Sequence, residues 1–507
     1  MYDSIIFTDV TDNMNANKAI GAYKCAKALR DAGYSCLVVD RLHKFSIEDL
    51  DRLFKVSVNQ NTKFVGFSTT FFANTNVGKN KDGSTPSYGI MGDSFMPWGK
   101  EFENQFMELI RSYCPSTKIV VGGANIRLFE KNRNVDYSVV GYSESSIVNL
   151  MDHLTNGTTL NKSIKNLWGI TVVDDRASED YDFVNNTMTW LDTDVVNQLL
   201  LPFEVARGCI FQCKFCSFPM NGKQNLDFIK TDTALKYELE RNFKEFGIYK
   251  YQIIDDTFND NDPKIDRILR LVESLDFQPE FWAYLRLDLL SRNYKSRFKK
   301  LYDIGLRSVS FGIETMHPEA AKIIGKGYDR ERQIETLHYI RNEHNDFLMS
   351  SGFIVGLPEE SIEQVTQTSN QLLNGEIPLH SWMFYPLTLQ PQNRVVWKSE
   401  FELNYKEYGY TYTDVVHEYP LGVEWVSKHM SFSDAMVLAN DFNTQQKAFS
   451  GLSTQKAWGY YGALGLDQKH LVSTPFNKID FNYIENLINL KDENYKKQLF
   501  DLLSKKF

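Results

Sequence analysis

Apolar runs and amphipathic segments alternate along the first third of the chain. The runs predict buried strands, and the segments with apolar residues at helical spacing predict helices between them. The predicted strands cover residues 4–7, 35–40, 63–69, 118–125 and 135–142, and the helices lie near 16–32, 100–113 and 144–155. This alternation predicts a parallel, doubly wound, Rossmann-like sheet, and therefore an α/β domain over residues 1–155.

A second series of strand–helix repeats runs from residue 201 to residue 391. The predicted strands are PFEVARG (202–208), YQIID (251–255), FWAYLR (281–286), SVSFGIE (308–314), SSGFIVG (350–356) and SWMFYPL (381–387). Six repeats predict a partial parallel (β/α)6 barrel, because the count does not reach the eight that close such a barrel. Its chemistry is expected at the carboxyl ends of the strands.

Three segments lack a clear strand–helix pattern. Residues 156–200 contain one short apolar run, at 169–173, and we interpret them as a linker. Residues 71–99, rich in Asn, Gly, Ser and Pro, interrupt the first domain, and so long a loop is either functional or disordered. Residues 392–507 are rich in aromatic residues and are predicted to form a mostly helical C-terminal domain.

Charge and composition argue against several classes of protein. The chain of 507 residues has a net charge of −9 and no block of Lys or Arg, which disfavours binding to nucleic-acid phosphates. It shows no secretory signal and no apolar stretch of about 18 residues, so we expect a cytoplasmic protein without membrane spans. Six cysteines are too few for a disulfide scaffold, and Cys25, Cys36 and Cys114 are expected to be buried or half-buried thiols.

The other three cysteines lie together directly after the first barrel strand. Cys209, Cys213 and Cys216 have the spacing C-x3-C-x2-C within RGCIFQCKFCSFP. Three thiolates on a [4Fe–4S] cluster leave one iron open to a substrate or cofactor, whereas closed iron–sulfur sites use four cysteines. The alternative is a zinc site completed by a distant His.

This motif resembles the signature of the radical S-adenosylmethionine (SAM) superfamily, in which an aromatic residue, here Phe215, precedes the last cysteine. The resemblance extends over roughly residues 200–390. It implies that the open iron binds the amino and carboxylate groups of SAM, and that reductive cleavage of SAM gives a 5′-deoxyadenosyl radical. It also implies an electron donor such as flavodoxin or ferredoxin, and a small-molecule or peptide substrate.

The ends of two barrel strands carry charged residues that the resemblance assigns to SAM. Asp255 and Asp256 follow the second strand, where the family binds the amino group of methionine, and a carboxylate pairs with an ammonium. The alternative is that each carboxylate only caps the strand end. Arg286, at the end of the third strand, either binds the SAM carboxylate or forms a structural ion pair.

The next two strands carry further matches. Glu314 ends the fourth strand where the family contacts the ribose or methionine groups, and a carboxylate can accept both ribose hydroxyls. GFIVGLP (352–358) resembles the fifth-strand motif, in which the backbone around Ile354 and Val355 lies against adenine. Gly352 and Gly356 are expected to permit that close approach.

The N-terminal domain resembles cobalamin (B12)-binding domains in its order of elements. The loop after the first strand contains no His, which rules out His ligation of cobalt from that loop but not cobalamin held without a protein ligand. Ser68, Thr70, Gly122 and Gly123 are the candidate contacts to its nucleotide tail. The alternative is a degenerate domain that only shapes the substrate pocket.

Three classes of function follow. The leading hypothesis is a cobalamin-dependent radical SAM C-methyltransferase. The second is a radical SAM rearrangement, cyclisation or oxidation without cobalamin, and the third is a non-catalytic scaffold that retains the fold. A methylthiotransferase is disfavoured because that subfamily needs three more cysteines for an auxiliary cluster. The sequence does not identify the substrate.

Overall fold

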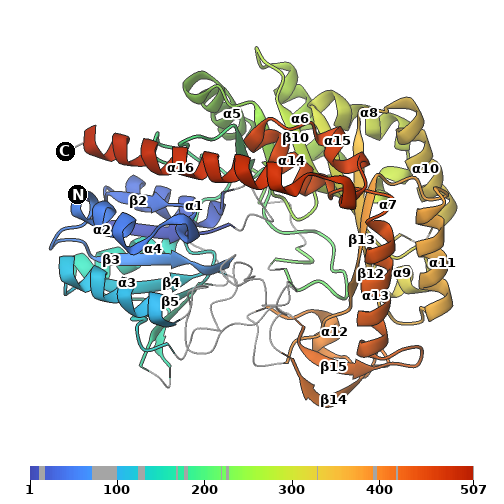
Figure 1. Cartoon of the computed structure of the whole chain (residues 1–507), viewed down its shortest axis with the longest axis horizontal. Helices are drawn as coiled ribbons and strands as arrows, with labels where there is room; N and C mark the ends of the chain where they lie inside the picture. Colours follow the sequence, from blue (N-terminus) through green and yellow to red (C-terminus); the bar gives the residue numbers. More distant parts are fainter. Residues whose placement is uncertain are drawn as a thin grey trace.

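The structure is a computed structural model of the whole chain. The residues that it describes are 1–10, 18–70, 100–123, 132–166, 169–175, 181–218, 220–223, 228–327, 329–391, 397–417 and 421–505. The 71–99 insertion lies outside them. Figure 1 shows two sheets side by side, each with helices packed on it.

The first sheet contains seven strands among the described residues, in the order β2-β1-β3-β4-β5-β7-β6, and only β6 pairs antiparallel. The strands are β1 (Ser4–Thr8), β2 (Cys36–Val39), β3 (Phe64–Ser68), β4 (Lys118–Gly122), β5 (Tyr137–Gly141), β6 (Ser163–Lys165) and β7 (Thr171–Asp175). The helices are α1 (Ile20–Asp31), α2 (Ile47–Ser57), α3 (Lys100–Tyr113) and α4 (Glu144–Asn156). The predicted doubly wound sheet is confirmed.

The sheet extends beyond the boundary expected at residue 155. The apolar run at 169–173 forms most of β7, which pairs with β5 and so continues the sheet into the segment interpreted as a linker. Helix α2 was not among the predicted elements, although it begins at a capping box. The side chain of Ser46 accepts a hydrogen bond from the Asp49 amide, and the Asp49 side chain accepts one from Ser46.

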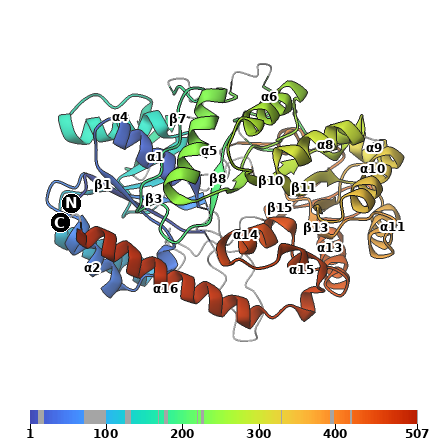
Figure 2. The ribbon, with the colours of Figure 1, turned by 90° about the horizontal axis from the view of Figure 1, so that it is seen from above.

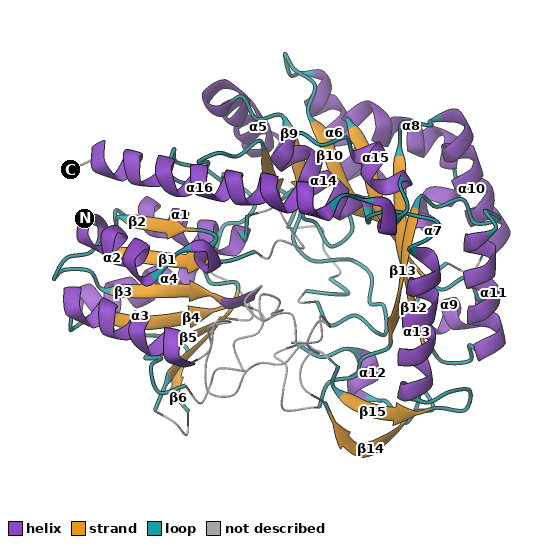
Figure 3. Cartoon of the chain, in the orientation of Figure 1, coloured by secondary structure: helices purple, strands orange, loops and turns teal. Residues whose placement is uncertain are grey.

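The second sheet contains six strands among the described residues, all parallel and in chain order from β8 to β13. They are β8 (Leu200–Phe203), β9 (Lys250–Ile253), β10 (Glu280–Leu285), β11 (Leu306–Glu314), β12 (Leu348–Val355) and β13 (Ser381–Pro386). The helices between them are α5 (Asp232–Phe246), α6 (Asp262–Glu273), α7 (Leu287–Ser291), α8 (Tyr294–Ile304), α9 (Pro318–Ile324), α10 (Arg330–Glu343) and α11 (Ile362–Leu373). The sheet curves with these helices on its outer side (Figure 3), so the predicted partial barrel is confirmed.

The C-terminal region is mostly helical, as predicted, and connects the two sheets. It comprises α12 (Glu400–Leu403), a hairpin of β14 (Thr411–Val416) and β15 (Val423–Val426), α13 (Phe432–Gln446), α14 (Thr454–Leu464), α15 (Gln468–Ser473) and α16 (Phe481–Lys505). Helix α14 packs on the barrel strands, where Thr454 Oγ1 accepts a hydrogen bond from Trp282 Nε1 at 3.1 Å. Helix α16 returns from the barrel to the first domain (Figures 1 and 2), where Leu499 and Leu503 join its core. No helix in the described part of the chain is both long and apolar enough for a membrane span.

Candidate functional site

The cysteine loop begins immediately after β8 and is fastened on several sides. The Lys214 amide donates to the carbonyl of Ile324, at the end of α9, and its carbonyl accepts from the Phe401 amide, in α12. Within the loop, the Cys216 amide donates to the Cys213 carbonyl at 3.0 Å. Because backbone bonds from distant elements hold the loop, the three cysteines are brought to the carboxyl end of the barrel in a fixed arrangement.

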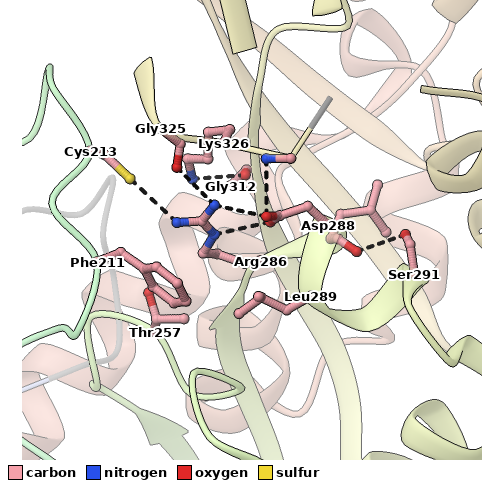
Figure 4. Close-up of polar contacts among 12 residues, drawn as sticks. Phe211, Cys213, Thr257, Arg286, Asp288, Leu289, Ser291, Gly312, Gly325 and Lys326 are labelled. Atoms are coloured by element: carbon pink, nitrogen blue, oxygen red, sulfur yellow. Dashed lines mark hydrogen bonds and ion pairs between the residues drawn. The ribbon is translucent and has the colours of Figure 1, made fainter. Parts of the chain in front are cut away.

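Each thiol has a polar partner of its own. The Asn221 amide group lies 3.0 Å from Cys216 Sγ, and the Phe211 backbone amide lies 3.5 Å from Cys209 Sγ. Arg286 Nη1 lies 3.6 Å from Cys213 Sγ (Figure 4). Donors directed at sulfur stabilise thiolates and tune the potential of an iron–sulfur cluster.

The arrangement fits a cluster better than a single metal ion. Among the described residues, no three His, Cys, Asp or Glu side chains converge closely enough to hold one ion, as a zinc site requires. The thiolates of a cubane cluster bind three separate irons, so they need not converge on one point. All three cysteines are free, with Cys209 buried and the other two half-buried. Burial raises the pKa of the Cys209 and Cys216 thiols, so loading must displace their protons.

Arg286 lies beside Cys213 and makes several contacts with protein groups. Its Nε and Nη2 donate to the two carboxylate oxygens of Asp288 at 3.0 and 2.8 Å, and Nη2 also donates to the Gly325 carbonyl at 3.0 Å (Figure 4). The guanidinium carbon lies 4.0 Å from the centre of the Phe211 ring. These contacts favour the structural ion pair over a role in binding the SAM carboxylate.

The two aspartates after β9 differ in their surroundings. Asp255 is buried, and its Oδ1 accepts from the Val205 and Ala206 amides at 2.9 Å each, which ties β9 to the start of the cysteine loop. Burial raises the pKa of Asp255 in spite of those bonds and of Lys264 nearby. Burial, followed by the charge of Asp255, raises the pKa of Asp256 to about 6.

Asp256 is the better placed of the two to receive a ligand. The charge of Asp256 contributes to the raised pKa values of the Cys209 and Cys216 thiols and, across the domains, of Tyr142. Asp256 therefore lies close to the cysteine loop. Among the described residues its carboxylate accepts no hydrogen bond. A half-buried carboxylate in this setting suits an ammonium group.

Glu314 has a strained backbone at the end of β11. Its φ is 68°, in the left-handed region that a non-glycine residue rarely adopts, and the register of β11 with β12 shifts just before it. Its Oε1 lies 3.5 Å from Lys326 Nζ, which also donates to the Gly312 carbonyl at 2.9 Å (Figure 4). Strain of this kind concentrates at functional sites, which supports the role predicted for Glu314.

Protein side chains pack beside the two glycines of the β12 segment, Gly352 within the strand and Gly356 directly after it. A Cβ on Gly356 would lie 2.4 Å from Trp425 Cη2, so protein fills that side of this glycine, and its approach to adenine stays a prediction. A Cβ on Gly352 would lie 3.4 Å from the ring of Tyr385. Ile354 is half-buried, whereas Val355 is fully buried in the core, so only the backbone of Val355 can serve the predicted site.

A cavity of about 580 Å³ opens at the carboxyl end of the first sheet. The four candidate cobalamin contacts, Ser68, Thr70, Gly122 and Gly123, all line it. Its lining also includes Ser217 and Phe218, which follow Cys216 directly. One cavity is therefore walled both by the N-terminal domain and by the cysteine loop.

Buried charges form part of the cavity wall between the domains. Arg207 Nη2 donates to Glu144 Oε1 at 2.7 Å, Arg207 Nε donates to Glu204 Oε1 at 3.2 Å, and Lys24 pairs with Glu204. Although burial opposes it, the charge of Arg207 holds the pKa of Glu144 below its usual range. None of these residues was predicted to belong to a site. A local signal for two of them is the pair of charges, Glu204 and Arg207, in the otherwise apolar segment PFEVARG.

The sequence model of the radical SAM superfamily matches residues 203–372, which begin at the end of β8 and include the cysteine loop. The barrel is a radical SAM domain. The predicted superfamily and the predicted barrel are thus confirmed by the sequence match and by the six-stranded sheet. The match covers the strand ends that carry Asp256, Arg286 and Glu314, but it does not reach β13 or the first sheet.

A curated relative matches about half of the chain. An uncharacterized methyltransferase, PH0819, of Pyrococcus horikoshii is 29% identical over 266 residues, 52% of this chain and 54% of that protein. The chain therefore spans about half the length of this relative.

Two solved structures share the fold over nearly the whole chain. The radical SAM methyltransferase TsrM from Kitasatospora setae, with cobalamin and a [4Fe–4S] cluster bound, has a TM-score of 0.63 at 13% identity, covering 97% of this chain and 100% of that one. The cobalamin-dependent radical SAM enzyme OxsB, with aqua-cobalamin and SAM bound, has a TM-score of 0.55 at 15% identity, covering 97% and 66%. At these identities the likeness shows the fold alone.

Proposed function

We propose that this chain is a cobalamin-dependent radical SAM methyltransferase that transfers a methyl group to a carbon atom of a small molecule. The observation that carries the proposal is the cavity shared by the first sheet and the cysteine loop. A corrinoid held there would adjoin the cluster site, as methyl transfer to a carbon radical requires. When bound, the cluster would supply an electron for SAM cleavage, and the corrinoid would supply the methyl group.

The residues present fit both groups. Cys209, Cys213 and Cys216 would hold three irons of the cluster and leave the fourth for SAM. Asp256 would pair with the SAM ammonium and Glu314 with its hydroxyls, while the β12 backbone would lie along its adenine. In the N-terminal cavity, hydroxyls such as Ser68 and Thr70 would hydrogen-bond to the nucleotide tail, and the apolar lining would exclude water.

Filling the cavity by mutation tests the corrinoid site. Gly21 lines the cavity, and a Cβ built on it meets no atom within 4 Å, so Gly21→Phe places a ring in open space. We expect the wild-type protein and Gly21→Ala to bind about one equivalent of hydroxocobalamin, and Gly21→Phe to bind it at least about tenfold more weakly. Equal binding by Gly21→Phe would show that the corrinoid lies elsewhere. No binding by the wild-type protein would refute the cobalamin part of the proposal.

Product analysis tests the chemistry. With a full cluster, reductant and SAM, we expect release of 5′-deoxyadenosine. Addition of hydroxocobalamin is expected to permit transfer of the isotopically labelled methyl group of SAM to a carbon-bound position of an added acceptor. Release of 5′-deoxyadenosine without any cobalamin binding would point instead to a rearrangement, cyclisation or oxidation.

A further inference from the structure

Arg207 joins the cysteine loop to the N-terminal domain through a buried ion pair. It lies two residues before Cys209, and its Nη2 donates to Glu144 Oε1 at 2.7 Å. The two side chains are only 3% and 4% exposed, so water does not screen the pair. Glu144 is the first residue of α4, close behind β5, and therefore belongs to the wall of the N-terminal cavity.

Aromatic rings fix the plane of the guanidinium. Its carbon lies 4.4 Å from the centre of the Tyr142 ring and 4.5 Å from that of the Phe183 ring. Tyr142 follows β5 of the first sheet, whereas Phe183 lies in the segment between the two sheets. A planar, forked cation can stack on rings while it donates to two carboxylates, and a lysine ammonium cannot reproduce both contacts.

The same side chains line the cavity and hold the loop. Arg207, Glu144 and Glu204 all contact the cavity, as does Lys24 of α1, which pairs with Glu204. On the other side, Lys223 Nζ donates to the Arg207 carbonyl within the cysteine loop. A movement of the loop relative to α4 would therefore break buried charge contacts and reshape the cavity at once.

We propose that Arg207 is a positioning residue that couples the two sites, so that a corrinoid in the cavity and a cluster on the cysteines each strengthen binding of the other. This inference rests on the proposed function, because it needs both groups to bind. Coupling between two sites is reciprocal, and a factor of about ten lies within the usual range. The physical cause is that Arg207 joins the loop to the cavity wall, so a group that stabilises one arrangement of the loop also stabilises the matching arrangement of the wall.

The wild-type protein gives the first test. We expect the Kd of hydroxocobalamin, measured anaerobically by absorbance titration, to be about tenfold lower for protein with a full four-iron cluster than for the apoprotein. Reciprocally, saturating hydroxocobalamin is expected to slow the loss of cluster iron to a chelator. Equal Kd values in the two forms, with binding in both, would overturn the inference and leave the proposed function standing. No binding in either form would overturn both.

Variants then test the role of Arg207. Arg207→Lys keeps the charge and loses the fork, and we expect the ratio of the two Kd values to fall close to one while each group still binds. The matched control is Arg30→Lys, because Arg30 forms a similar pair with buried Asp194 at 2.6 Å between the first domain and the segment before the barrel, away from the cavity lining. Coupling that persists in Arg207→Lys, or disappears equally in Arg30→Lys, would contradict the inference. If Arg207→Lys does not fold, the ratio of the two wild-type Kd values and the rate of iron loss to the chelator decide whether the two sites are coupled.

Discussion

Replacing Asp256 by Asn should make the apoprotein more stable and the loaded protein unable to bind SAM. Asp256 follows β9 near the cysteine loop, where burial raises its pKa from the ordinary value of 3.8 to about 6. Ionising this carboxyl in the folded protein therefore costs free energy, which lowers the stability of the wild-type protein at neutral pH. We propose that the compensation is an ammonium group supplied by SAM.

The magnitude follows from proton linkage. Between the unfolded and folded pKa values the folded protein retains a proton that the unfolded chain releases, so stability falls as the pH rises through this window. The full cost above pH 7 is about 3 kcal/mol, and nearly half of it develops between pH 5 and pH 7.5. Asp256→Asn lacks the titrating group, so its stability advantage over the wild-type protein should grow by that amount over the same pH range.

Urea unfolding of the apoproteins at pH 5 and pH 7.5, followed by circular dichroism, measures the difference. Asp276→Asn, at an exposed position in the same barrel, is the control for the loss of one carboxylate. SAM binding is then measured with the cluster-loaded proteins, and we expect Asp256→Asn to lose it and Asp276→Asn to retain it. An advantage for Asp256→Asn that does not change with pH, or undiminished SAM binding, would refute the reasoning.

Three further predictions address the cluster, the barrel and the domain contact. Cys213→Ser should reduce the iron of the reconstituted protein from about four per chain to nearly none, since two thiolates do not hold the cluster; unchanged iron content would exclude Cys213 as a ligand. Gly356→Ala should lower the free energy of unfolding by about 3 kcal/mol, because its Cβ would lie 2.4 Å from buried Trp425; a loss near 1 kcal/mol, as strain alone would give, would show that the tryptophan moves aside. Tyr495→Phe removes the acceptor that lies 3.0 Å from the buried Asp40 amide and should cost about 1–3 kcal/mol in urea unfolding; no loss would mean that this contact does not hold α16 to the first domain.

Local patterns in the sequence were sufficient for the barrel strands, for β1 to β5 and for the cysteine loop. Each barrel strand is a short apolar run followed by a helical pattern, and the strand order follows the chain order, so the topology required no long-range information. The first sheet was harder, because β6 and β7 lie beyond α4 in a stretch of weak periodicity. Their pairing with β5 became apparent only in the structure.

Contacts between distant segments account for what the sequence did not predict. The pairing of Arg207 with Glu144 joins residues 63 positions apart, and neither residue type in isolation indicates the other. Likewise, the space beside Gly356 is occupied by Trp425 of the β14–β15 hairpin, which no local pattern could reveal. Sequence patterns thus place residues at the ends of strands, whereas tertiary packing decides whether the space beside them belongs to a ligand or to the protein.

The open iron is the claim on which the radical chemistry depends, and electron paramagnetic resonance of the reduced, reconstituted protein tests it most directly. We predict that protein with about four irons per chain gives the signal of a reduced [4Fe–4S] cluster, and that addition of SAM changes this signal because SAM binds the iron that lacks a cysteine. A signal that stays the same under saturating SAM would mean that a protein side chain completes the cluster, and it would contradict the account.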